Sequence, residues 1–391
     1  MINKLKPRMA NAQPNATANK AAGSLQIRKW FGCSNLGLFL YVSFCVILTA
    51  IAYLRPLPTF DRYLYAGAVA SLRYSDPVII HRIARTEFDA QPSPFLFESV
   101  ASEPYFADVR DNPYHFVQQL GFYRVKLGYV AIGYLLWRMG LPILVGLRLI
   151  SACCLLIVGL AVLTWTHDAA LSVVLLLTPS VMSMGRMVTA DPPSTTIIFL
   201  ALFAIAKEKE LIAAILLTAS VLLRFDNTVV IVIILAWMVW RRCIGLSLGI
   251  LFGALAVIAA VWATRITGYY GWRVLMQHSF IKPEIEPVTH PILINFAGYV
   301  HAMAGLRVIP YTFMTIWILV AAATWKRLPS GAIFRELLPL AGICILVRLA
   351  IYPNVEDRYF LWEYLLAGVA LVQTAQSSIP ENKEDTICQP L

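Results

Sequence analysis

The chain has 391 residues, of which 59% are apolar and only 14% are charged, and its mean hydropathy is +0.68. These values exclude an ordinary soluble domain and are typical of a protein that crosses a membrane several times. The formal net charge of +10 arises partly from a basic N-terminal tail and from basic short loops. It therefore requires no nucleic-acid partner.

Residues 1–35 are polar and rich in Asn, Ala and Lys, so we expect a disordered cytoplasmic tail. A helix needs about 20 apolar residues to cross a hydrocarbon layer of about 30 Å, and apolar runs on this scale recur through residues 36–375. We therefore predict an all-α polytopic membrane domain with about ten transmembrane helices. The predicted spans cover residues 36–54, 143–163, 170–185, 192–206, 211–223, 228–240, 245–263, 311–325, 337–352 and 359–375.

Residues 114–139 are apolar enough to resemble a further span, but their first half carries His115, Arg124 and Lys126. Each charge at the bilayer centre costs about 2.5–3.5 kcal/mol on insertion scales. We therefore expect an interfacial helix on the outer surface, inside a large outer loop at 55–142. Residues 291–309, within a second outer loop at 264–310, carry His301 and Arg307 and are interpreted in the same way.

The short loops indicate the orientation. With ten spans, the basic tail, Arg241 with Arg242, and Lys326 with Arg327 all fall on one side, which the positive-inside rule assigns to the cytoplasm. Both termini, including the tail 376–391, are then cytoplasmic. None of the seven cysteines lies in the two outer loops, so we expect no disulfide framework. The missing outer cysteines and compact loops favour a bacterial inner membrane, with the large loops in the periplasm.

Asp61 follows the first span and precedes an amphipathic segment, Arg62 to Leu72. One interpretation is that Asp61 caps that helix. A second is that its carboxylate, held at the membrane surface, is a general base that removes a proton from an acceptor hydroxyl or amine. The two interpretations are compatible, because a cap also fixes the direction of the carboxylate.

Asp191 lies at the start of a predicted span and precedes Pro192 and Pro193, a pattern that also suits a helix N-cap. A second carboxylate near Asp61 would also suit a divalent cation that offsets the charge of a phosphate. The sequence shows no set of metal ligands at a defined spacing. A cation held by Asp61 and Asp191 is therefore an open alternative, and no cofactor is firmly predicted.

Several cationic side chains lie at the outer ends of apolar spans. Snorkelling explains one or two such residues. A convergence of several from separate helices favours a grip on an anionic head group, because guanidinium groups bind phosphate oxygens in a bidentate way. The candidates for this grip are Lys126, Arg148, Arg224, Arg348, Arg358 and its neighbour Tyr359.

These motifs together resemble the GT-C superfamily of membrane glycosyltransferases, which includes protein O-mannosyltransferases and aminoarabinose transferases. The resemblance rests on the layout of the short motifs around Asp61, on Arg148 at the head of the second span, on the stretch from Arg186 to Asp191, and on Glu356-Asp357-Arg358-Tyr359 before the last span. The chain departs from that family in having no acidic residue beside Asp61, no Pro-Pro after Lys126 and no C-terminal soluble domain.

The resemblance implies an inverting transfer of a sugar from a polyprenyl-phosphate carrier to an acceptor on the extracytoplasmic face. Asp61 would be the base, Asp191 a supporting or metal-binding carboxylate, and the cationic residues the phosphate grip. The partners would be the lipid-linked donor and the membrane itself. A flippase or other transporter of lipid-linked sugars, or an inactive scaffold of the same fold, are the alternatives. Transporters place ionisable groups near the bilayer midplane, whereas here they gather at the outer ends of spans.

Overall fold

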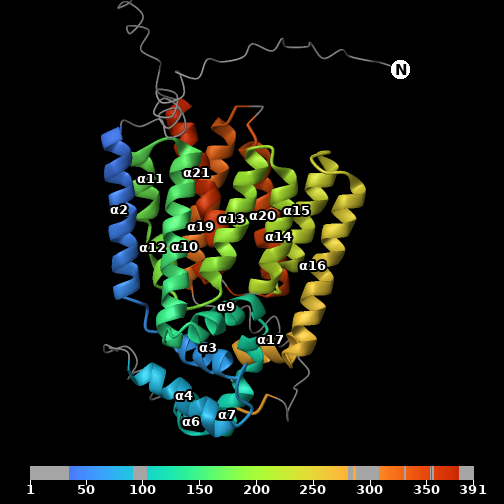
Figure 1. The fold of residues 1–391 in the computed structure, drawn as a ribbon. Coiled ribbons are helices and arrows are strands. Elements are labelled where there is room, and N and C mark those ends of the chain that lie inside the picture. Colours follow the sequence, from blue (N-terminus) through green and yellow to red (C-terminus); the bar gives the residue numbers. More distant parts are fainter. Residues whose placement is uncertain are drawn as a thin grey trace, which may run out of the picture.

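A computed structural model describes residues 35–90, 104–280, 285–287, 308–329, 332–352, 354 and 356–377. Every regular element among these residues is a helix, and none of them forms a strand. The helices form two parts, a bundle of long, roughly parallel helices and a cap of short helices across one end of it (Figure 1). The all-α prediction is confirmed for the described residues.

The bundle helices correspond to the apolar segments of the sequence. Three of them, α2, α10 and α16, are long and apolar enough to cross a membrane by length and composition, and the bent pair α11 and α12 would make a fourth. α10 has 24 residues, which corresponds to about 36 Å of helix. The bundle comprises α2 (Asn35–Leu54), α10 (Ile143–Thr166), α11 (Ala169–Leu176), α12 (Pro179–Arg186), α13 (Asp191–Ala206), α14 (Glu210–Leu223), α15 (Asn227–Trp240), α16 (Leu246–Ile266), α19 (Val308–Arg327), α20 (Phe334–Ile351) and α21 (Leu361–Ser377).

The segment 170–185 is not the single straight helix that its hydropathy predicts. It is divided into α11 and α12, which meet at an angle of 69°. Pro179 begins α12, and the residue before it, Thr178, is extended with ψ at 139°. A proline disfavours helical geometry in the preceding residue, so the chain breaks here.

The cap consists of α3 (Asp61–Ala70), α4 (Pro77–Asp89), α6 (Pro104–Asp111), α7 (Pro113–Gln119), α8 (Gly121–Arg124), α9 (Leu127–Arg138) and α17 (Trp272–Phe280). These helices lie beside and across the lower end of the bundle in Figure 1. Residues 114–139 thus form three short helices in the cap, and no single helix of that segment runs through the bundle. Residues 291–307 and both predicted tails, apart from residues at their inner edges, lie outside the described residues.

The helix α3 is the centre of the cap. All of its residues from Arg62 to Ala70 are buried, and it packs against α4, α8 and α9 and the end of α10. At Gly67 a Cβ atom would collide with the ring of Phe116, so glycine permits the close approach of α7. This packing holds the start of α3, and with it Asp61, against the end of the bundle.

Candidate functional site

A polar cavity of about 130 Å³ lies between the cap and the end of the bundle. Its walls bring together residues from α3, the segment before α9, the start of α13, the end of α14, α17 and the loop before α21. The cavity is lined by Asp61, Tyr65, Phe122, Tyr123, Lys126, Asp191, Arg224, Leu275, His278, Ser279, Tyr352, Arg358 and Tyr359. Six of the eight residues predicted as site residues therefore share one cavity.

Asp61 is the first residue of α3, but its side chain does not cap that helix. The N-cap is Phe60, and no side-chain hydrogen bond caps the helix, so the interpretation of Asp61 as a cap is wrong. Instead the Tyr123 hydroxyl donates to Oδ1 at 2.7 Å, and Arg358 donates to Oδ2 at 2.6 Å. The carboxylate is drawn away from the backbone of its own helix by these two partners.

Burial raises the pKa of the Asp61 carboxyl, but the charge of Arg358 and the hydrogen bond from Tyr123 together lower it further, so the net pKa lies below the ordinary value. Burial and the adjacent Asp61 charge raise the pKa of Tyr123 well above its usual range. Tyr123 therefore stays protonated and donates to a carboxylate that stays ionised.

Asp191 shows the same departure from the expected cap. The N-cap of α13 is Ala190, without a side-chain cap hydrogen bond. Asp191 is only 6% exposed, accepts a hydrogen bond from the Thr189 hydroxyl at 2.8 Å and pairs with Arg224. The Asp191 carboxylate therefore holds Arg224 in the wall of the cavity.

Arg224 directly follows α14, as its C-cap residue, and forms ion pairs with two carboxylates. Besides Asp191 it grips Asp226 with two bonds, from Nε at 3.0 Å and from Nη2 at 2.6 Å. Its guanidinium carbon lies 4.7 Å from the centre of the Tyr359 ring. Burial raises the pKa of Asp226, but the charges of Arg224 and Arg348 outweigh it, and the net pKa lies below the ordinary range. The cluster is therefore ionised.

Lys126 precedes α9 and reaches into the cavity between aromatic rings. Its Nζ donates to the Phe122 carbonyl at 2.5 Å and lies 5.0 Å from the centre of the Tyr123 ring. Burial, followed by the nearby charge of Arg224, lowers the pKa of Lys126 to about 8. It is a cation with only a carbonyl acceptor, so it has donors to spare for an anion.

Arg348 lies behind the cavity wall and supports it. It donates to the carbonyl of Tyr359 and, at 2.7 Å, to Oδ1 of Asn227. Asn227 in turn donates to the Ser194 hydroxyl at 2.6 Å. This chain ties α20, α15 and α13 to the loop that carries Arg358, and Arg358 also pairs with Glu356 at 2.6 Å.

Arg148, also predicted to grip phosphate, lies apart from this cavity. It belongs to α10, and its guanidinium carbon lies 5.1 Å from the centre of the ring of Tyr53, which is near the C-terminal end of α2. Sequence reasoning in turn missed Asn227 and Tyr65. The signal for Asn227 was present, because it follows Asp226 at the point where two apolar helices meet.

A divalent cation between Asp61 and Asp191 was the open alternative. Each carboxylate oxygen of the two residues already accepts from a hydroxyl or an arginine. Across the described parts of the chain, no three His, Cys, Asp or Glu side chains gather as a metal site. The geometry favours cationic side chains, rather than an ion, as the groups that face an anion.

A larger chamber of about 310 Å³ adjoins the polar cavity. Lys126, Arg224 and Tyr359 line both, while the larger chamber continues between apolar residues of α15, α16 and α17, among them Val229, Ala260 and Trp272. The cations therefore lie at the junction of a polar and a mainly apolar space.

Comparisons with protein-family models, with curated proteins and with solved structures found no match to this chain.

Proposed function

We propose that the protein is a membrane glycosyltransferase of the GT-C type, which transfers a sugar from a polyprenyl-phosphate carrier to an acceptor. The observation that carries the proposal is the shared wall of the two chambers. A phosphate at Lys126 and Arg224 would direct its prenyl chain into the apolar chamber and its sugar toward Asp61. An amphiphile with an anion at its centre fits this arrangement of charges and walls.

The chemistry assigns a role to each group. Asp61 removes the proton of the acceptor hydroxyl, and the acceptor oxygen attacks the anomeric carbon from the face opposite the phosphate. The bond between that carbon and the phosphate oxygen breaks, and the phosphate leaves with the electron pair as polyprenyl phosphate. Lys126 and Arg224 stabilise the charge that develops on the leaving oxygen. One displacement inverts the anomeric configuration.

The carrier also has to compete for Arg358. In the structure this arginine holds Asp61 at 2.6 Å, which keeps the carboxylate a weak base. A phosphate that recruits Arg358 would release Asp61, and the loss of that positive charge raises its pKa toward the ordinary value. Binding of the donor would thereby prepare the base.

The membrane arrangement is part of the same proposal. All ten bundle segments, the bent pair counted as one, would span the bilayer, and the cap would lie on the extracytoplasmic side of a bacterial inner membrane. The basic loops at Arg241 and Lys326 would then face the cytoplasm. Polar chemistry at the cap end favours transfer at the surface over transport through the bundle, because the ion pairs of the cavity lie where the helices end.

The test is a transfer assay on the protein reconstituted in liposomes with radiolabelled polyprenyl-phosphate hexoses and pentoses and a membrane extract as the source of acceptor. We expect free polyprenyl phosphate to be released from at least one donor, with the label passing to another molecule. Arg224→Ala should abolish release, while Arg82→Ala, an exposed cap arginine, should not. Movement of intact donor across the bilayer without cleavage would instead identify a flippase and refute the transferase.

A further inference from the structure

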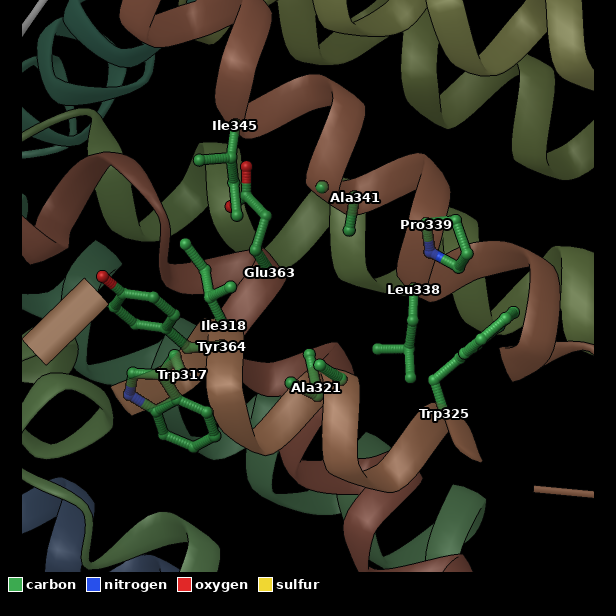
Figure 2. Close-up of a pocket in the computed structure, with 13 residues that line it drawn as sticks. Trp317, Ile318, Ala321, Trp325, Leu338, Pro339, Ala341, Ile345, Glu363 and Tyr364 are labelled. Carbon is green, nitrogen blue, oxygen red and sulfur yellow. The ribbon is translucent and has the colours of Figure 1, made fainter. Parts of the chain in front are cut away.

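A second cavity, separate from the site above, lies within the bundle between α19, α20 and α21. Its volume is about 230 Å³. Trp317, Trp325, Pro339 and Ile345 are among its walls (Figure 2). The lining residues Ile318 and Trp325 are 45% and 38% exposed, so the cavity is reached from the outer surface of the bundle.

One side chain in this apolar cavity is acidic. Glu363, from α21, lines it (Figure 2). The residue is 3% exposed, and, apart from its own backbone N–H, no hydrogen-bond donor of the described chain reaches either carboxyl oxygen. Arg348, a charged neighbour, is turned to Tyr359 and Asn227. A buried carboxyl group without a hydrogen-bond partner is costly, so a ligand that supplies a donor would stabilise this position.

The neighbours of Glu363 define the chemistry of that partner. The rings of Trp317 and Tyr364 stack with centres 5.3 Å apart and planes at 13°, and both line the cavity. An amine that enters the cavity can take up the proton of the Glu363 carboxyl group and form an ion pair with it, and an ammonium group is also attracted to the face of an aromatic ring. An anion would find no cation among the lining residues, and a neutral hydroxyl group would form a hydrogen bond with Glu363 but no ion pair.

The shape of the cavity defines the rest of the ligand. Trp317 and Trp325 are separated by eight positions on α19, which corresponds to about 12 Å along the helix. The wall between Glu363 and Trp325 contains Ile318, Ala321 and Leu338 and offers no charged group. A slender apolar chain fits this stretch, whereas a cavity of about 230 Å³ is too small for the two chains of a whole phospholipid.

We propose that this cavity binds a single-chain lipophilic amine, with its ammonium group on Glu363 and its chain along α19 toward Trp325. The proposal goes beyond the glycosyltransferase function and does not rest on it, since the two cavities share no lining residue. The ammonium group is the shared chemistry of two sources, a free amine and the head group of an ethanolamine lipid with a single acyl chain. The experiment below distinguishes them.

The probes are octylamine, octanol and octanoate, which carry the same chain with a cationic, a neutral and an anionic head group. Dissociation constants are measured for the purified protein in a non-ionic detergent from the shift in its melting temperature. We expect octylamine to bind about 10- to 100-fold more tightly than octanol, the range for contacts with a charged group. Glu363→Gln, which keeps the shape of the side chain, should reduce the preference to within about twofold. Equal binding of the three probes by the parent protein, or an unchanged preference in the Gln variant, would overturn the proposal.

A second variant tests the cavity itself. Gly342 lines it, and a Cβ atom there meets no other atom within 4 Å, so Gly342→Phe should fill the space and abolish octylamine binding. Gly253 in α16 has the same open surroundings outside the cavity, and Gly253→Phe should bind octylamine as the parent does. Retention of binding by Gly342→Phe would place the amine elsewhere. Competition by lysophosphatidylethanolamine but not by lysophosphatidylcholine, each of which has one acyl chain, would assign the site to the lipid head group, and no competition by either would assign it to the free amine.

Discussion

Replacement of Asp61 by asparagine separates a catalytic base from an ion-pair partner. Asn retains an oxygen that accepts the hydrogen bond of Tyr123, now 2.7 Å from Oδ1, but it has no charge to pair with Arg358. Arg358 keeps its second partner, Glu356, at 2.6 Å. Because Asp61 is not an N-cap, no helix cap is lost either. We expect Asp61→Asn to fold and to extract from membranes as the parent does.

The effect on turnover should be large. General-base assistance contributes about 10²–10⁴-fold in rate, and an amide cannot accept the proton at neutral pH. The affinity for the carrier, by contrast, should not fall in this variant. Arg358 loses one of its two counter-ions and becomes more available to phosphate, so the donor should bind as tightly as to the parent or more tightly. A fall in turnover with retained or stronger binding is the signature of a lost base.

The assay is single-turnover release of polyprenyl phosphate, with carrier binding measured in parallel on the same preparations. The matched control is Asp111→Asn, which removes a carboxylate from an exposed ion pair of the cap, with Arg110 at 2.9 Å, and Asp111 does not line the cavity. The control should turn over normally. Normal transfer by Asp61→Asn would remove Asp61 from the mechanism, and weakened carrier binding would refute the competition for Arg358.

Three further predictions follow from the same geometry. The pKa of Lys126 is lowered to about 8, so its charge is present below that pH and lost above it. Carrier affinity, measured by titration, should therefore fall as the pH rises through about 8. Lys126→Arg should remove this dependence because arginine stays charged. Arg224→Ala should weaken carrier binding about 10- to 100-fold, whereas Arg148→Ala should leave it unchanged because Arg148 lies over Tyr53; equal effects would contradict the assignment of the cavity. In a cysteine-free background, Arg110→Cys should react with a membrane-impermeant thiol reagent added outside and Arg242→Cys should not, and the reverse pattern would overturn the proposed orientation.

The helices were predictable because each depends on a local property of the chain. The apolar run at 143–163 predicts α10, and the charges of Arg124 and Lys126 predict that their segment leaves the bundle. The break in the segment 170–185 was also local, since Pro179 stands inside the apolar run. Hydropathy alone does not predict this break, because it averages over a window of residues and does not register the effect of a proline on the backbone before it.

The pairings of the site were not predictable in the same way. Asp61 and Asp191 both stand where a helix is expected to begin, so local rules interpret them as caps. Each is instead held by an arginine from far along the chain, Arg358 and Arg224, and 297 positions separate Asp61 from its partner. Arg148 and Arg348 illustrate the same limit. All the candidate arginines look alike in sequence, and only the packing shows which ones face the cavity.

The two arginines of the cavity wall are each paired with carboxylates of the chain. Arg224 is neutralised by Asp191 and Asp226, and Arg358 by Asp61 and Glu356, so neither arginine is an isolated buried charge. A phosphate must therefore exchange with carboxylates that are already in place, and its net gain is smaller than its contacts alone suggest. Lys126 differs, since its Nζ donates to a carbonyl and to no carboxylate. It is the group most able to meet the phosphate first, and the release of Asp61 from Arg358 can then follow as the anion moves inward.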